Sequence, residues 1–129
     1  MPDSLEVLAG FNSTRKLKEV IIPANVKTIE ESAFNYCEKL KTIIIPATVT
    51  KIDDSAFAFC TDLVDVYIPS SVKEMHDYVF LGSDKVVIHT PAGSYAEAFA
   101  KRRNISCVNN VLGMWIGDSK VEEEFIRWL

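Results

Sequence analysis

Residues 17–39, LKEVIIPANVKTIEESAFNYCEK, are followed without a gap by residues 40–62, LKTIIIPATVTKIDDSAFAFCTD. The two segments have the same length, and 12 of their 23 positions carry the same residue. Residues 63–85, LVDVYIPSSVKEMHDYVFLGSDK, keep the leucine, the isoleucine–proline pair, the valine and the phenylalanine in the same register. Because self-similarity at a fixed period is the signature of stacked repeats, the sequence predicts a solenoid in which each coil has the length of one such segment.

Each repeat begins with a predicted strand that ends at a proline. Apolar residues at alternate positions, such as Ile43 and Ile45, indicate a strand with one buried face. Pro46 ends that strand, because proline cannot donate the next hydrogen bond of a sheet. The chain then turns back, and further apolar positions point inward from this return leg. The expected core positions of the three full repeats are Leu17, Leu40, Leu63, Val20, Ile43, Val66, Ile22, Ile45, Ile68, Val26, Val49, Val72, Ile29, Ile52 and Met75.

A small residue and then a phenylalanine follow the return leg of every repeat. Phe34, Phe57 and Phe80 share one column, so we expect their rings to stack as a continuous ladder inside the coils. Cys37 and Cys60 share another column, where a small side chain closes the turn. The chain has three cysteines and no C-x-x-C pair, which favours free buried thiols, with a disulfide between these two as the alternative.

Partial repeats flank the three full repeats, residues 17–85, within one predicted domain, residues 1–129. Residues 5–16 resemble the second half of a degenerate repeat. Residues 86–108 hold a strand with its proline, then a helix and a last short strand, and residues 109–129 suggest a C-terminal helical cap. The apolar stripe of that cap could instead bind a partner chain. Ser94 is the expected N-cap of the first helix, and the helically spaced residues are Tyr95, Ala98, Phe99 and Arg102 there and Val121, Phe125, Trp128 and Leu129 in the cap.

The joint pattern of these columns, L-x-x-I-x-I-P-x-x-V-x-x-I-x-x-x-A-F-x-x-C, resembles the BspA-like leucine-rich repeats of bacterial and some protist surface proteins. The resemblance covers about residues 5–108. It implies an α/β-type leucine-rich-repeat solenoid, a right-handed coil with short parallel strands on a concave side and irregular or short 3₁₀ return legs opposite. The family's usual glycine before the cysteine is replaced here by Tyr36 and Phe59, whereas Gly82 keeps the pattern.

Candidate protein-binding residues lie between the buried positions of the predicted strands. One column holds Ile21, Ile44 and Tyr67, and alignment on the proline adds His89; the neighbouring column holds Glu19, Thr42, Asp65 and Val87. An exposed apolar row often marks a contact surface. The alternatives are the ordinary strand preference of branched and aromatic residues, or cover from a neighbouring subunit.

Tyr36 and Phe59 form a second aromatic pair, on the turn side of the coils. Such a pair could contact a partner, or it could simply stack between adjacent coils, because aromatic rings on neighbouring strands stabilise each other. The sequence leaves both interpretations open.

Several function classes find no support in the residues. The two histidines, His76 and His89, fall on different parts of the coil, and no nucleophile motif accompanies them, so we expect no enzyme. Glu30–Glu31 and Asp53–Asp54 repeat in register but lack the spacing of calcium-binding repeats, so no metal or cofactor is expected. A net charge of −4 argues against nucleic acid, and no apolar run is long enough to enter a membrane.

The resulting functional expectation is a non-enzymatic protein-interaction or adhesion module. The resemblance implies a secreted or cell-surface protein that adheres to host or matrix proteins, although residues 1–6 lack the basic start and apolar run of a secretory signal. The alternative is a structural repeat segment that completes a longer array or self-associates weakly through Ile21, Ile44 and Tyr67.

Overall fold

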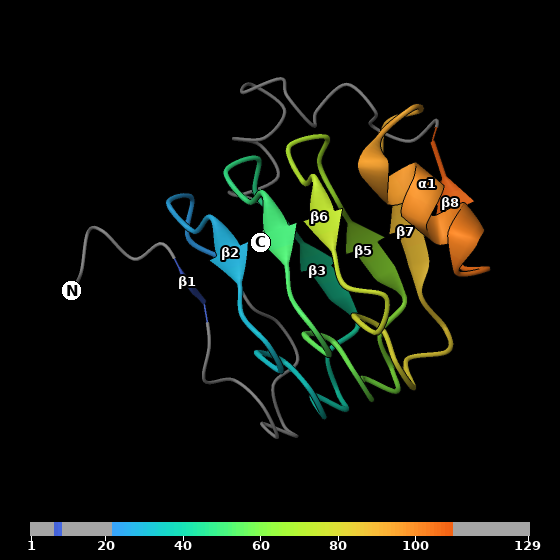
Figure 1. The fold of residues 1–129 in the computed structure, drawn as a ribbon. Helices are drawn as coiled ribbons and strands as arrows, with labels where there is room; N and C mark the ends of the chain where they lie inside the picture. The colour runs from blue at the N-terminus through green and yellow to red at the C-terminus, as the bar shows by residue number, and fades with distance from the viewer. Residues whose placement is uncertain (1–6, 9–21, 110–129) are drawn as a thin grey trace.

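The computed structural model describes residues 7–8 and 22–109. Their elements are short parallel strands and one helix, arranged as stacked coils (Figure 1). One sheet has the order β1-β2-β4-β6 and the other β3-β5-β7-β8. The bounds are β1 Val7–Leu8, β2 Thr28–Ile29, β3 Thr42–Ile44, β4 Lys51–Ile52, β5 Asp65–Tyr67, β6 Glu74–Met75, β7 Val87–His89, α1 Tyr95–Arg102 and β8 Ser106–Val108.

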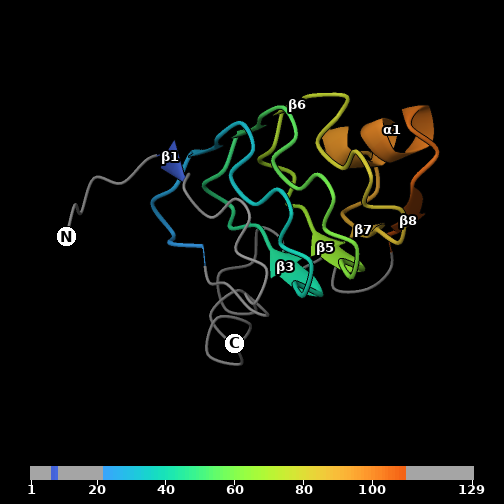
Figure 2. The same ribbon diagram turned by 90° about the horizontal axis from the view of Figure 1, so that it is seen from below.

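The two sheets lie on opposite sides of the coils, and α1 and β8 lie at one end (Figure 2). The first sheet runs along the return legs and the second contains the strands that precede the prolines. This arrangement confirms the solenoid predicted from the repeat, and the parallel strands of successive coils are the pattern of a leucine-rich-repeat fold.

Strand register follows the repeat period. Thr42 pairs with Asp65, and Ile29 pairs with Ile52, in each case at the equivalent position of the next repeat. Asp65 pairs with Val87, one position short of a full repeat, which agrees with the alignment of the two strands on Pro69 and Pro91. At the N-terminal end the backbone of residues 7–8 pairs with that of residues 28–29, which is two positions short of a full repeat. The half repeat is therefore shifted from the sequence alignment of the repeats at this point.

The return legs differ from the expected irregular or 3₁₀ structure. They carry two-residue strands that form a second ladder, in which the Thr50 N–H donates to the Lys27 carbonyl at 2.8 Å and the Lys73 N–H to the Thr50 carbonyl at 2.9 Å. Because successive coils are equally long, the same extended residues of each leg lie side by side and their backbone groups pair. Regular coil length thus gives strands on both sides.

The core consists of the predicted columns. Within the described residues, every position expected to point inward from a strand or return leg is at most 6% exposed. Phe34 and Phe57 stack with their ring centroids 5.2 Å apart and an interplanar angle of 1°, and Phe57 and Phe80 stack at 5.8 Å and 18°. The phenylalanine ladder is therefore confirmed, and each stacked pair contributes about 0.5–1.5 kcal/mol beyond its buried area.

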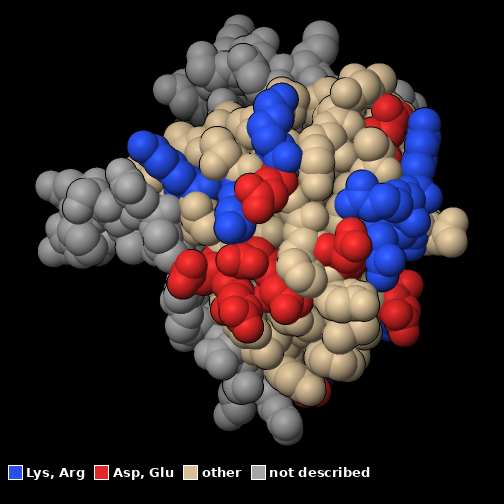
Figure 3. All heavy atoms as spheres, viewed as in Figure 1, with Lys and Arg blue, Asp and Glu red and all other residues tan. Residues whose placement is uncertain are grey.

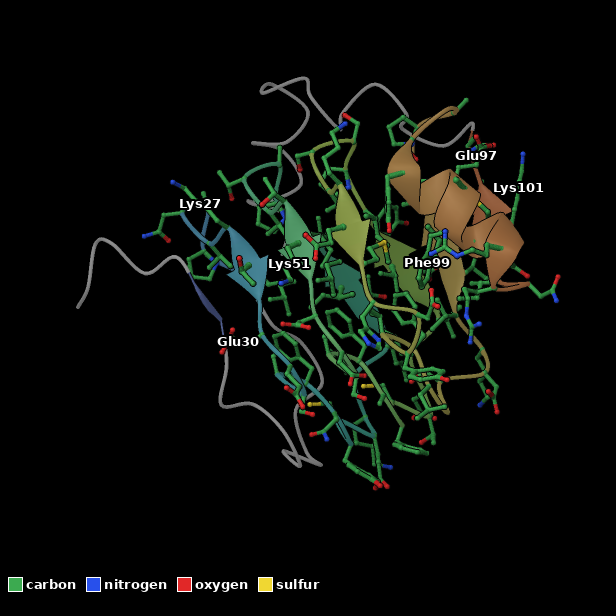
Figure 4. All side chains as sticks on the ribbon, viewed as in Figure 1. Lys27, Glu30, Lys51, Glu97, Phe99 and Lys101 are labelled. Carbon is green, nitrogen blue, oxygen red and sulfur yellow. The ribbon has the colours of Figure 1, made fainter. Side chains whose placement is uncertain are left out.

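Helix α1 covers the C-terminal end of this ladder. Ser94 caps it, since its Oγ accepts the Glu97 N–H at 3.1 Å. Phe99 points toward the coils, and its ring packs edge-on with that of Phe80 at a centroid distance of 6.4 Å, whereas Lys101 points outward (Figure 4). No helix among the described residues has the length and apolar content needed to cross a membrane.

The buried face of α1 differs from the predicted one. Ala96, Phe99 and Ala100 are buried, while Ala98 and Arg102 are exposed. The two small alanines flank Phe99 at helical spacing and let the helix approach the coils closely, which turns the longer side chains outward. The last strand, β8, forms as predicted, and the second predicted helix with Val121, Phe125, Trp128 and Leu129 lies outside the described residues.

Candidate functional site

The predicted strand-side column is aligned as expected, but it is not uniformly open to solvent. Ile44 pairs with Tyr67 and Tyr67 with His89, and the Tyr67 and His89 rings stack at 4.3 Å. Ile44 and Tyr67 are half-buried. His89 is buried, with 9% exposure, because its ring lies against Tyr67 and its edge against Asp65. The expectation that His89 faces solvent is therefore wrong, and Ile21 lies outside the described residues.

The neighbouring column is also in register. Thr42, Asp65 and Val87 are half-buried, and Glu19 lies outside the described residues. The His89 Nε2 lies 2.8 Å from the Asp65 Oδ1, so this hydrogen bond ties β7 to β5. Burial raises the pKa of the Tyr67 hydroxyl, and the Asp65 carboxylate raises it further. The hydrogen bond between Asp65 and His89 thus helps to hold the adjacent strands β5 and β7 together.

A second surface runs along the turns that connect each return leg to the next strand. Tyr36 and Phe59 stack at 4.9 Å and 16°, as the packing interpretation predicted, and they remain 39% and 36% exposed. Both have left-handed backbones, with φ of 63° and 56°, and Gly82 in the third coil has φ of 74°. The family's glycine position is therefore a left-handed position in every coil, and the stacked rings offset the strain of the two aromatic residues.

Two further apolar side chains extend this surface. Tyr78 is 50% exposed and Leu81 47%. We call Tyr36, Phe59, Tyr78 and Leu81 the turn edge; among the described residues they are the large hydrophobic side chains that are exposed. Sequence reasoning missed the last two. The available signal was a break in the repeat, since Tyr78 and Leu81 replace Ser55 and Ala58 of the previous coil.

Polar groups connect the turns beneath this edge. The Phe57 N–H donates to the Val79 carbonyl at 2.9 Å, and the Cys60 N–H donates to the Ser83 Oγ at 2.9 Å. The Cys60 thiol donates to the Phe34 carbonyl at 3.1 Å. A hydrogen bond with the Cys37 side chain and burial both raise the pKa of Cys60, so its thiol stays protonated. The three cysteines form no disulfide among the described residues; Cys37 and Cys60 are buried as expected, whereas Cys107 is half-buried.

Charged side chains occupy the face that carries β2, β4 and β6. In Figure 3 acidic side chains gather just beyond the ends of these strands, and basic side chains cover the end where α1 lies. The Lys51 Nζ lies 3.6 Å from the Glu74 Oε2, and the Arg102 Nη2 lies 3.2 Å from the Asp77 Oδ1. Within residues 22–109, no three His, Cys, Asp or Glu side chains group as metal ligands. Exposed ion pairs of this kind are screened by solvent and contribute little to stability.

The repeat columns match a known family over most of the chain. Residues 8–109 match the BspA type leucine rich repeat region (6 copies). The chain belongs to the BspA-type leucine-rich-repeat family. Leucine-rich repeats of this kind are typical of protein-interaction modules, and their fold is typically a scaffold without catalysis.

A solved structure supports the fold of this BspA-type chain. The crystal structure of a leucine-rich-repeat protein from T. pallidum is similar, with a TM-score of 0.58 and 22% sequence identity. The match covers 87% of this chain and 59% of that chain, so the present chain spans less than two thirds of the T. pallidum protein. No curated protein matches the chain.

Proposed function

We propose that this BspA-type solenoid is a non-enzymatic protein-binding module and that the turn edge is its main contact surface. The observation that supports the proposal is the gathering of Tyr36, Phe59, Tyr78 and Leu81 on one side of the coils, each more than a third exposed. Exposed apolar patches often mark contact surfaces, and aromatic side chains supply much of the binding energy at protein interfaces.

The strand-side columns are the second candidate surface. Ile44 and Tyr67 form an in-register apolar row with Thr42 and Asp65 beside it, and this row supports a contact surface formed by the strand-side columns. We place it second because Ile44 and Tyr67 are half-buried and His89 is buried, so less apolar area is offered to a partner. Ile21 and Glu19 belong to the same proposal from their place in the repeat.

We further propose an adhesive role in a secreted or cell-surface protein. The resemblance of the repeat columns to bacterial and protist surface proteins supports this finer assignment. The alternative role is a structural segment that self-associates through Ile21, Ile44 and Tyr67. Sedimentation at increasing protein concentration distinguishes the two roles, because self-association through this column is weakened by Tyr67→Glu.

Capture experiments with matched variants test the choice of surface. Extracellular-matrix proteins captured by the immobilised wild-type chain are compared with those captured by Tyr78→Ser/Leu81→Ser and by Ile44→Asp. The double variant is expected to lose at least about tenfold of its affinity, which corresponds to about 1.4 kcal/mol, while Ile44→Asp retains binding. The reverse result would assign the binding site to the strand-side row of Ile44 and Tyr67. Equal capture by all three proteins rejects both surfaces.

A further inference from the structure

The backbone hydrogen bonds between successive turns all point in one direction. In the first coil the Phe34 N–H donates to the Ala56 carbonyl at 2.7 Å, and the Tyr36 N–H donates to the Ala58 carbonyl at 2.8 Å. The second coil repeats the pair at the equivalent positions, from Phe57 to Val79 at 2.9 Å and from Phe59 to Leu81 at 2.7 Å. Each turn therefore offers two N–H groups, two residues apart, to carbonyls of the coil that follows.

The third turn offers the same two donors, and within the described residues neither finds an acceptor. Phe80 and Gly82 are the equivalents of Phe57 and Phe59, and no hydrogen bond of their N–H groups exists there. Helix α1 replaces the next turn. The Phe99 ring of the helix packs edge-on with Phe80, but the helix backbone does not supply the two carbonyls. The row of donors therefore ends at Phe80 and Gly82, whose N–H groups have no acceptor among the described residues.

These donors border a hollow rather than packed side chains. A hollow of about 310 Å³ lies between the third turn and the segment that follows α1. Its lining includes Phe80, Leu81 and Gly82 on one side and Arg103, Asn104 and Ser106 on the other. The Arg103 guanidinium lies 5.7 Å from the centre of the Tyr78 ring, which places this cation at the border of the turn edge.

The chemistry of the hollow favours a peptide main chain over a small anion. In the preceding coils the two donors take carbonyls of two different residues that lie two positions apart on a turn of the next coil, so the matching acceptor is a polypeptide turn. Asp77 and Asp84 line the hollow together with Arg103, so no excess of positive charge selects an anion.

We propose that the hollow binds a turn-forming segment of a partner protein, which continues the backbone hydrogen bonds between turns beyond the third coil. Two carbonyls of the segment, two residues apart, accept the N–H groups of Phe80 and Gly82, and its side chains contact Leu81 and Tyr78. The mode is backbone pairing at an open edge, with apolar contacts alongside. The proposal rests on the protein-binding function and specifies where and by what chemistry a partner is held.

Amide exchange of the isotopically labelled full chain, followed by NMR, tests this directly. The probe is a synthetic peptide copying residues 52–61 with Cys60→Ser, because the Ala56 and Ala58 carbonyls of this segment accept such bonds within the solenoid. Saturating peptide is expected to slow exchange at Phe80 and Gly82 at least tenfold. The amides of Phe57 and Phe59 are already bonded and should not change.

The control peptide replaces the two accepting carbonyls with methylene groups and should not protect Phe80 or Gly82. In the protein, Ser106→Trp places a large side chain at the hollow and should weaken peptide binding at least tenfold, whereas Ser106→Ala should not. Slow exchange of both amides in the free, dilute protein overturns the proposal, as does peptide binding that leaves them unprotected. Protection that grows with protein concentration alone identifies a second copy as the occupant and also overturns it.

These outcomes are separate from those of the capture experiment. If Tyr78→Ser/Leu81→Ser abolishes partner capture while the peptide leaves the Phe80 and Gly82 amides of the wild-type chain unprotected, the protein-binding function stands. The proposed backbone hydrogen bonds to the partner are then rejected. Undiminished capture by that double variant, together with peptide protection of both amides, rejects the turn edge as the main contact surface and supports the proposed backbone hydrogen bonds.

Discussion

The residue before the cysteine position combines two demands in each coil. Its backbone is left-handed, which favours glycine, and it lies where rings of adjacent turns stack. Glycine at residue 82 adopts the left-handed backbone easily and leaves room for the neighbouring ring, because a Cβ built on Gly82 would lie 2.3 Å from Cδ1 of the Phe59 ring. The ring of the second coil therefore occupies the space that a side chain at residue 82 would need.

Replacement of Gly82 by alanine should destabilise the fold more than the same change at Gly93. Both residues have positive φ, 74° and 82°, so each variant carries a conformational cost of about 1–2 kcal/mol. Gly82→Ala also forces the Phe59 ring to move, which adds about 1–3 kcal/mol, whereas a Cβ at Gly93 meets nothing within 4 Å. Urea unfolding of both variants measures the difference, and equal losses would contradict the close contact with Phe59.

At the scale of elements, the strands before the prolines and helix α1 could be predicted, and the return-leg strands could not. Alternation around Ile43 and the cap at Ser94 are local signals, and both elements formed where these signals lie. A two-residue strand such as β4 is too short to show alternation, and it exists because an equal leg lies beside it. The buried face of α1 was likewise set by packing against the coils.

The candidate site was less predictable than the fold. The repeat gave the register of Ile44, Tyr67 and His89 correctly, but register does not fix exposure. His89 became buried through its stack on Tyr67 and its hydrogen bond to Asp65, which are contacts between coils. The exposure of Leu81 depends in the same way on what covers the third turn.

The Cys60 thiol, which forms a hydrogen bond between adjacent turns, should make the stability of the fold depend on pH. The Cys60 pKa is raised in the folded chain, so the folded state keeps its proton when the unfolded thiol ionises above about pH 9. The stabilisation is complete below that pH and is lost as pH rises further, by at most about 1.4 kcal/mol per pH unit. Urea unfolding at pH 8 and pH 10 measures this loss.

Cys60→Ser supplies the control for that measurement. In the next coil the Ser83 Oγ donates to the Phe57 carbonyl in the way that the Cys60 thiol donates to the Phe34 carbonyl, so a hydroxyl suits this position. The variant should fold with a loss below about 1.5 kcal/mol at pH 8, since hydrogen bonding is kept. Its stability should fall less between pH 8 and pH 10 than that of the wild type. An identical fall would show that Cys60 does not cause the pH dependence.

At the scale of the whole molecule, stability resides in contacts between coils. No coil can bury its own apolar face, and the phenylalanine ladder joins all three full repeats to α1. Phe57, fully buried, has a ring neighbour on each side. Damage at this residue therefore affects two interfaces.

Phe57→Ala should lower the free energy of unfolding by about 3–5 kcal/mol, as expected for loss of a buried aromatic side chain. Tyr78→Ala removes an aromatic side chain that is half exposed, and it should cost no more than about 1 kcal/mol. Thermal unfolding of both variants, followed by circular dichroism, makes the comparison. Similar melting temperatures for the two would mean that the ladder does not carry the stability of the stack.

The one-way hydrogen bonds of the turns give the molecule a polarity. The paired backbone N–H groups of each turn face the following coil, and the carbonyls that accept them face the preceding coil, so the backbone of a turn presents different groups to its two neighbours. Two molecules joined by their third turns would bring donor against donor, and a symmetric end-to-end dimer through this ladder gains no hydrogen bonds. Growth along this axis must be head to tail, as in a filament, and anything that seals the donor end also stops such growth.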